Sequence, residues 1–178
     1  MRDIEGIEEV VAKLRPHMGE IDARFNEENA RFKALMGQDH DIIGRVLKCH
    51  LVIEHYLDRF LSNHYGIADI SAPKLSFFQK AKLLPDRAAA AAFVKPAILC
   101  LNSIRNRFGH SLEPRVILNE LQPMLNVLVV VRPEAKFVDP IDAIEAFTTI
   151  ASTWLIVPPP SLQQVFMDAF STVKVNTL

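Results

Sequence analysis

Apolar residues along this chain recur every three or four positions, which is the spacing of a helix that buries one face. In the first part of the chain, the pattern predicts one helix that ends near Pro16 and a second, more polar helical segment that reaches Gly37. We therefore interpret residues 1–38 as an N-terminal helical extension. Residues 39–178 are expected to form the main bundle and its C-terminal helical additions, within a single domain overall.

A long helix is predicted over residues 39–65, with Gly66 as its C-cap. Its apolar stripe also carries His50 and Glu54, which are polar residues at positions that the helical period assigns to the core. A buried carboxylate needs a cation beside it, because an unpaired charge in an apolar interior is costly. Glu54 is therefore expected to need a cationic partner, and His50 is better interpreted as a core or surface histidine.

Helices are also expected through the rest of the chain. One covers residues 76–84, and another runs from the alanine-rich stretch 88–92 to about Phe108, with Pro96 either kinking it or starting a new helix. Residues 115–131 predict two short helices or one kinked helix, with a strand as the minor alternative.

Two further helices are predicted at the end of the chain. Asp139 and Pro140 form an N-cap and first-turn pair for one helix, and Ser161 caps the last helix after three consecutive prolines. No alternating strand pattern stands out. The predicted fold is an all-α helical bundle of roughly six to eight helices.

Composition says more about where the protein is expected to be found than about what it does. The formal net charge is −1, so a site for a polyanion would have to be a local patch. Cys49 and Cys100 lie outside any metal-binding or redox spacing. The N-terminus lacks the apolar stretch of a signal peptide, and no apolar run could span a bilayer. We expect a cytoplasmic protein with no membrane partner.

The segment Leu-Asn-Ser-Ile-Arg-Asn-Arg-Phe-Gly-His-Ser at residues 101–111 concentrates the candidate chemistry. Arg105, Asn106, Arg107 and His110 fall within six residues at the end of an amphipathic helix. A permanently charged guanidinium beside an imidazole that titrates near neutrality suits acid–base chemistry on a phosphodiester.

Helical geometry assigns directions to these side chains, at about 100° per residue. Asn106 and His110 are expected opposite the core with Ser103 nearby, so that Asn106 could orient His110. Arg105 lies at the flank of the core face, where it could meet Glu54, and Arg107 points to solvent. The predicted core face comprises Val94, Ala97, Ile98, Leu101, Ile104 and Phe108.

A purely structural interpretation has about equal weight. Basic residues near a helix C-terminus interact favourably with the last carbonyls and the macrodipole. An arginine–glutamate pair can also simply hold two helices together. A metal site is less favoured, because His50, Glu54 and His55 do not form an H-E-x-x-H pattern.

The motif Arg105-Asn106-x-x-x-His110 resembles the R-x4-6-H motif of the HEPN domain family, with Asn106 as the polar residue that usually follows the arginine. The order of elements is similar as well, and the resemblance covers about residues 39–131. It implies an all-α bundle that dimerises through the motif helices. Many members of this family are metal-independent endoribonucleases, including toxins of toxin–antitoxin pairs and defence proteins.

The resemblance also implies roles for single residues. His110 would act as general base or acid, Arg105 would stabilise charge on the scissile phosphate, and Asn106 would orient the pair. Glu54, Ser103 and Arg107 would support them. We expect a homodimer with RNA as substrate, an antitoxin or regulatory protein as a further partner, and no cofactor or metal. The alternative is a non-catalytic helical regulatory or interaction module that keeps the motif for structure or for phosphate or nucleotide binding.

Overall fold

The computed structural model describes residues 7–36, 40–70, 72–111, 114–156 and 158–174. The described residues form α-helices and short 3-10 helices, and none of them belongs to a strand. One isolated β-bridge joins Arg87 and Lys174. The prediction of an all-α helical bundle is confirmed, and the strand alternative for residues 115–131 is wrong.

The chain divides into two compact units, Met1–Asp39 and His40–Leu178. In the first unit, α1 (Ile7–Leu14) and α2 (Met18–Met36) are joined by a 3-10 turn. Apolar side chains of this unit stay largely in contact with solvent, since Val10 and Val11 are about half exposed. This unit therefore has little core of its own.

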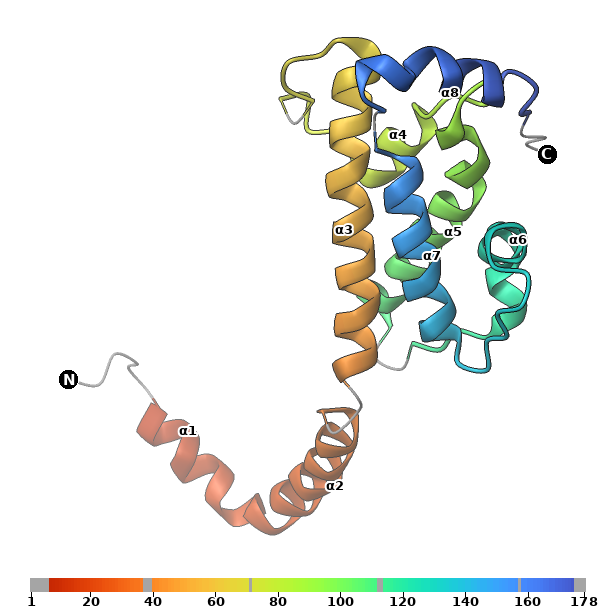
Figure 1. Cartoon of the computed structure of the whole chain (residues 1–178). Coiled ribbons are helices and arrows are strands. Elements are labelled where there is room, and N and C mark those ends of the chain that lie inside the picture. Colours follow the sequence, from red (N-terminus) through yellow and green to blue (C-terminus); the bar gives the residue numbers. More distant parts are fainter. Residues whose placement is uncertain (1–6, 37–39, 71, 112–113, 157, 175–178) are drawn as a thin grey trace. The chain divides into compact units, whose positions relative to one another are not determined.

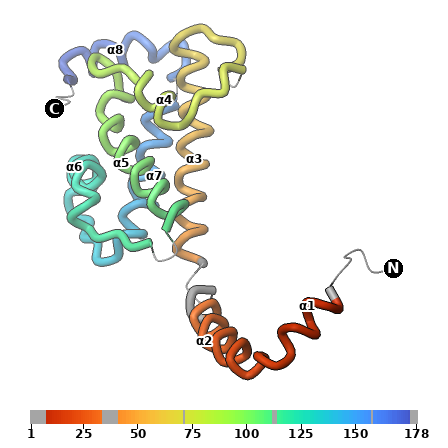
Figure 2. Tube along the Cα trace, turned by 180° about the vertical axis from the view of Figure 1, so that it is seen from behind, coloured from red at the N-terminus to blue at the C-terminus, as the bar shows by residue number. Residues whose placement is uncertain are grey.

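The second unit is built around three long helices, which are α3 (His40–Tyr65), α5 (Ala90–His110) and α7 (Pro140–Trp154). They pack pairwise on one another (Figures 1 and 2). The short helix α4 (Phe77–Lys82) packs against α3 and α5, and α6 (Gln122–Val131) packs against α5 and α7. The core lies between these helices and contains all six side chains that the helical period assigned to the core face of α5.

Local sequence signals explain where several helices begin and end. Gly66 follows α3 with φ of 65°, and the N–H of Ile67 donates to the carbonyl of Ser62 at 2.9 Å, which is a glycine C-cap. Asp139 caps α7 by accepting a hydrogen bond from the N–H of Ile141 at 2.9 Å. Pro96 lies inside α5 without dividing it into two helices.

The end of the chain is less buried than its apolar pattern predicts. Helix α8 (Gln163–Phe170) lies across one end of the bundle (Figure 1) and contains no buried residue.

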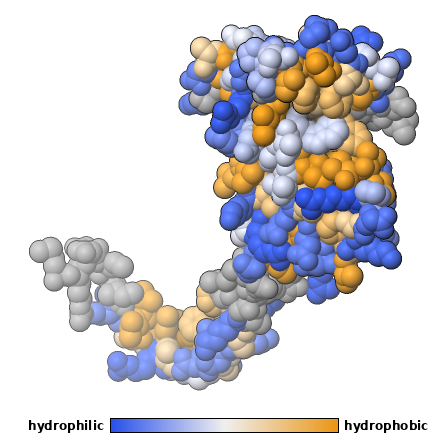
Figure 3. All heavy atoms as spheres, in the orientation of Figure 1, coloured by the Kyte–Doolittle hydropathy of each residue, from blue (hydrophilic) through white to orange (hydrophobic). Residues whose placement is uncertain are grey.

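Apolar side chains also reach the surface around α6 (Figure 3), where Val129 and Val130 are more than half exposed. Among the described residues, no helix combines the length and the apolar character needed to cross a membrane.

Candidate functional site

The last two turns of α5 carry the Arg–His cluster at the edge of the bundle. Ile104 and Phe108 are buried and hold this end of the helix against the core, while Asn106 and His110 are exposed on the other side. Arg105 lies between the two faces and is partly buried. These directions are the ones that the helical period predicted.

Arg105 reaches along the helix towards its C-terminal end. Its Nη1 donates a long hydrogen bond of 3.5 Å to Oδ1 of Asn106. The same Nη1 lies 3.9 Å from the place where a Cβ on Gly109 would stand. Its Nε is buried and has no hydrogen-bond partner among the described residues. A buried guanidinium donor without a partner is unusual, because desolvating it costs free energy that no bond returns.

His110, the last residue of α5, is exposed to solvent. Asn106 bonds Arg105, and no bond from Asn106 to His110 occurs in the described part of the chain. The expected orienting contact is therefore absent within one chain. The chain brings Arg105 and Asn106 together, and the imidazole of His110 is exposed to solvent.

The supporting residues Ser103 and Arg107 have local partners. The hydroxyl of Ser103 donates to the carbonyl of Leu99 at 3.3 Å. Arg107 does not simply point to solvent, because its Nη1 pairs with Oε1 of Glu120 at 2.6 Å. This hydrogen bond, with a second from the backbone of Ile117, lowers the pKa of Glu120. Arg107 therefore fixes the segment before α6 to the end of α5.

A polar pocket of about 350 Å³ opens beside Arg105. Helix α3, the start of α4 and the end of α5 supply its walls. The lining residues are His50, Glu54, Ser76, Phe77, Phe78, Asn102, Arg105 and Asn106. The pocket therefore joins the anomalous polar residues of α3 to the cluster on α5, but it does not include His110.

His50 forms the inner part of this pocket. Its ring stacks on Phe77 with a centroid distance of 3.9 Å, and only 6% of the residue is exposed. Its Nε2 is buried without a partner among the described residues. Burial lowers the pKa of His50, partly offset by the nearby Glu54 carboxylate and by the side chain of Asn102, which lies against the imidazole. The imidazole is therefore neutral at neutral pH and is able to donate or accept one hydrogen bond at Nε2.

The expected ion pair between Glu54 and Arg105 is not formed. Glu54 Oε1 instead accepts a hydrogen bond from Nζ of Lys80 at 3.0 Å, and Asp58 pairs with the same ammonium at 2.7 Å. Lys80 comes from α4, which packs on α3 and α5 and places the lysine beside both acids. The prediction was wrong because the apolar pattern of residues 76–84 gives no sign that a lysine is buried there. In the structure the Lys80 side chain is only 8% exposed and supplies the cation that Glu54 needs.

Sequence reasoning missed four residues of the pocket, and a signal existed for only part of them. The pattern predicts a helix over residues 76–84 without indicating that Ser76, Phe77 and Phe78 line a pocket, and it does not single out Asn102. Among the histidines, His50 was noticed on the apolar stripe and assigned to a core or surface role. An apolar stripe interrupted by a histidine and an acid was the available signal for a buried polar pocket.

No group of three or more histidine, cysteine, aspartate or glutamate residues that could hold a metal ion occurs in the described ranges.

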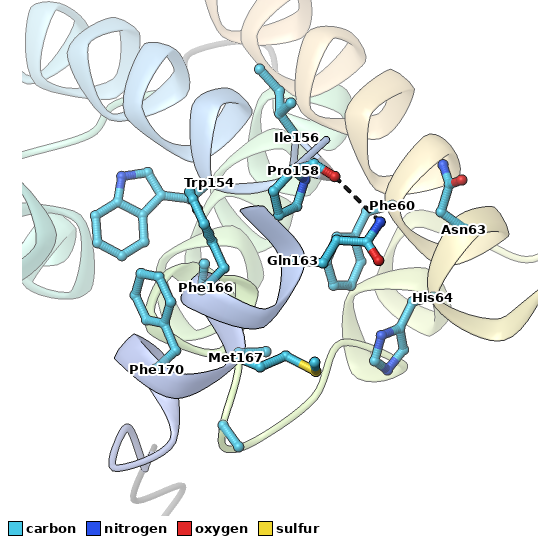
Figure 4. Close-up of a pocket in the computed structure, with 13 residues that line it drawn as sticks. Phe60, Asn63, His64, Trp154, Ile156, Pro158, Gln163, Phe166, Met167 and Phe170 are labelled. Carbon is cyan, nitrogen blue, oxygen red and sulfur yellow. Dashed lines mark hydrogen bonds between the residues drawn. The ribbon is translucent and has the colours of Figure 1, made fainter. Parts of the chain in front are cut away.

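Figure 4 shows a second cavity, of about 360 Å³, at the opposite end of α5 under α8. Its lining is mainly apolar, with Trp154, Phe166 and Phe170 among its side chains. The edge of the Trp154 ring meets Phe170 at a centroid distance of 5.5 Å. None of the cluster residues lines this cavity, so the polar pocket is the candidate functional site.

Comparison of the chain with models of known families, with curated proteins and with solved structures gives no match. The function must therefore be argued from the site itself.

Proposed function

We propose that this chain is a HEPN-like, metal-independent endoribonuclease, which acts as a homodimer in the cytoplasm. The observation that carries the proposal is Arg105, a partly buried guanidinium whose buried Nε has no partner among the residues that the structure describes, in the same helix end as an exposed His110. Arg105 forms no ion pair among the described residues, because Glu54 pairs with Lys80, so its guanidinium is available to a developing negative charge. The resemblance of Arg105-Asn106-x-x-x-His110 to the R-x4-6-H motif supports the same assignment.

The proposed reaction uses the RNA 2′-hydroxyl as nucleophile. A neutral His110 imidazole takes the 2′-OH proton while the 2′ oxygen attacks the neighbouring phosphorus. The bond from phosphorus to the 5′ oxygen breaks, and a second, protonated imidazole donates a proton to that leaving oxygen. Arg105 stabilises the additional negative charge on the phosphoryl oxygens. The products are a 2′,3′-cyclic phosphate and a free 5′-hydroxyl.

A dimer accounts for the second imidazole, because each chain carries one motif. His110 is exposed at the end of α5, so two motif helices can approach across a two-fold axis without unfolding either bundle. In this proposal the biological setting is a toxin–antitoxin pair or a defence system, with an antitoxin or regulatory protein as further partner.

One observation favours a second candidate. Asn106 bonds Arg105 rather than His110, and His110 does not line the polar pocket, so a single chain does not assemble an acid–base pair. This arrangement suits a non-catalytic helical regulatory or interaction module that uses Arg105 for phosphate or nucleotide binding.

Cleavage of mixed RNA in the presence of EDTA tests the two candidates. The samples are wild type, His110→Ala and a matched control, His55→Ala, which removes another exposed histidine outside the pocket. The nuclease proposal expects 2′,3′-cyclic phosphate ends from wild type and from His55→Ala, and none from His110→Ala. Absence of cleavage by a folded, dimeric wild type would favour the regulatory module.

A further inference from the structure

The polar pocket contains two buried hydrogen-bonding atoms that lack partners in the described part of the chain. They are Nε2 of His50 and Nε of Arg105, on α3 and α5 respectively. His50 is more than nine-tenths buried. Buried polar atoms are almost always paired in native proteins, so two orphans in one pocket indicate a polar ligand that supplies the missing bonds.

The walls of the pocket suit a flat ring. His50 lies on Phe77 in a stacked arrangement with an interplanar angle of 27°. Phe78 also lines the pocket, yet it is 48% exposed, so its ring is available to solvent or to a ligand. The ammonium of Lys82 lies 5.5 Å from the centre of the Phe78 ring. Unpaired bases of single-stranded RNA are recognised by stacking on aromatic rings of this kind.

The charges around the pocket favour a neutral ring over an anion. The positive charge of Arg105 is accompanied by the carboxylate of Glu54 in the same lining. Glu54 and Asp58 together carry two negative charges against the single ammonium of Lys80. An inorganic phosphate would meet the carboxylate as well as the guanidinium, whereas an uncharged base with donors and acceptors on different edges would satisfy both.

We propose that this pocket binds an unpaired guanine base. Guanine presents the acceptors O6 and N7, which suit the donor groups of arginine. It also presents the donors N1–H and N2–H, which suit a carboxylate such as Glu54. A carboxylate has about four lone-pair sites, so Glu54 keeps acceptor capacity beyond its bond to Lys80. No other RNA base combines these acceptors with two adjacent donors.

The inference rests on the proposed ribonuclease for its biological meaning, because a bound guanine would place a neighbouring phosphate near the motif. Arg105 connects the two places, since its Nε is one of the orphan atoms and its Nη1 extends towards Gly109. Guanine in the pocket therefore predicts that RNA is cut next to unpaired guanosines.

Calorimetric titration of the full chain tests the pocket without requiring cleavage. The probes are the 5′-monophosphates of guanosine, adenosine, cytidine and uridine, and inorganic phosphate alone. We expect the guanosine nucleotide to bind at least about tenfold more tightly than the other three, which corresponds to one good bidentate contact. Equal affinities for all four nucleotides, binding of inorganic phosphate at the same strength, or no binding at all would overturn the proposal.

Variants locate the binding. Phe78→Leu removes the exposed ring and should weaken guanosine monophosphate binding by roughly five- to 150-fold, the range found for loss of base stacking. Phe166→Leu is the matched control, because Phe166 is 39% exposed and lines the other cavity. Unchanged binding in Phe78→Leu would reject the pocket. His50→Gln tests whether the buried imidazole contributes to guanosine monophosphate binding. If this variant does not fold, the comparison of Phe78→Leu with Phe166→Leu decides the question.

The two proposals fail separately. Selective guanosine binding without any RNA cleavage would retain the pocket and reject the ribonuclease. Cleavage that depends on His110 but shows no guanosine selectivity, in cut sites or in nucleotide binding, would retain the ribonuclease and reject the guanine pocket.

Discussion

Replacing Lys80 by methionine tests whether the ammonium of this residue is what allows two acids to lie beside the pocket. Lys80 forms ion pairs with Glu54 at 3.0 Å and with Asp58 at 2.7 Å, and its own side chain is 8% exposed. Methionine preserves much of the apolar volume but removes the charge. Lys80→Met therefore leaves two carboxylates together without a cation.

The size of the effect follows from the exposure of the acids. Removing one partner of a fully buried ion pair costs roughly 3–5 kcal/mol. The side chains of Glu54 and Asp58 are 28% and 32% exposed, so water compensates part of this cost. We therefore expect a loss of about 2 kcal/mol in the free energy of unfolding, between the values for buried and exposed pairs.

The pH range of this contribution follows from the lysine. Burial by itself lowers the pKa of Lys80, but hydrogen bonds to Asp58 and Glu54 outweigh it and the net pKa is raised. The contribution of the lysine is therefore complete from neutral pH up to its ordinary value of 10.5, and it is lost as the pH rises through the higher folded-state pKa.

Urea denaturation at neutral pH, followed by fluorescence of Trp154, the single tryptophan of the chain, provides the measurement. A loss of about 2 kcal/mol lowers the midpoint by about 1 M. Lys82→Met is the control, because Lys82 is an exposed lysine on the same helix. The triple variant Lys80→Met, Glu54→Gln, Asp58→Asn should recover much of the loss. Equal midpoints for Lys80→Met and Lys82→Met would refute the reasoning.

Two further predictions concern the helices that carry and support the site. Gly109→Ala should stabilise the bundle by about 0.5–1 kcal/mol, measured by the same denaturation, because Gly109 is helical and an added Cβ meets only Arg105 Nη1 at 3.9 Å; a lower midpoint would contradict the geometry at the end of α5. Glu145→Gln should make stability less dependent on pH in the acidic range. The hydrogen bond from Arg45 lowers the pKa of Glu145, so this contribution is complete above the ordinary value of 4.5 and is lost as the pH falls through the folded-state pKa. Identical acid-unfolding curves for wild type and Glu145→Gln would count against a stabilising role for this pair.

The sequence predicts the bundle well where one face of a helix decides its packing. All six residues assigned to the core face of α5 are buried, and the exposed directions of Asn106 and His110 agree with the helical period. Gly66 and Asp139 end and begin helices as expected, because these caps depend on neighbouring residues. The prediction that Ser161 caps the last helix is wrong, because Ser161 lies within a 3-10 turn and α8 begins after Leu162. By contrast, the apolar stripe of α8 does not predict burial, since the period shows which side is apolar and not whether another element covers it.

The candidate site is likewise predicted from the sequence only where its residues lie on one helix. Local spacing identifies Arg105, Asn106 and His110 as a cluster, because residues of one helix end are neighbours whatever the rest of the chain does. Which cation meets Glu54 depends on how α4 packs, and the structure places Lys80 there instead of Arg105.

The sequence by itself thus determined the helices, their buried faces and the Arg–His cluster, all of which follow from contacts within a few residues. Only the tertiary structure decided that α3, α4 and α5 enclose a polar pocket in which His50 stacks on Phe77 and two buried nitrogens lack partners within the described ranges. The physical reason is that helical periodicity fixes the direction of each side chain around its own axis. It does not fix which helix lies opposite.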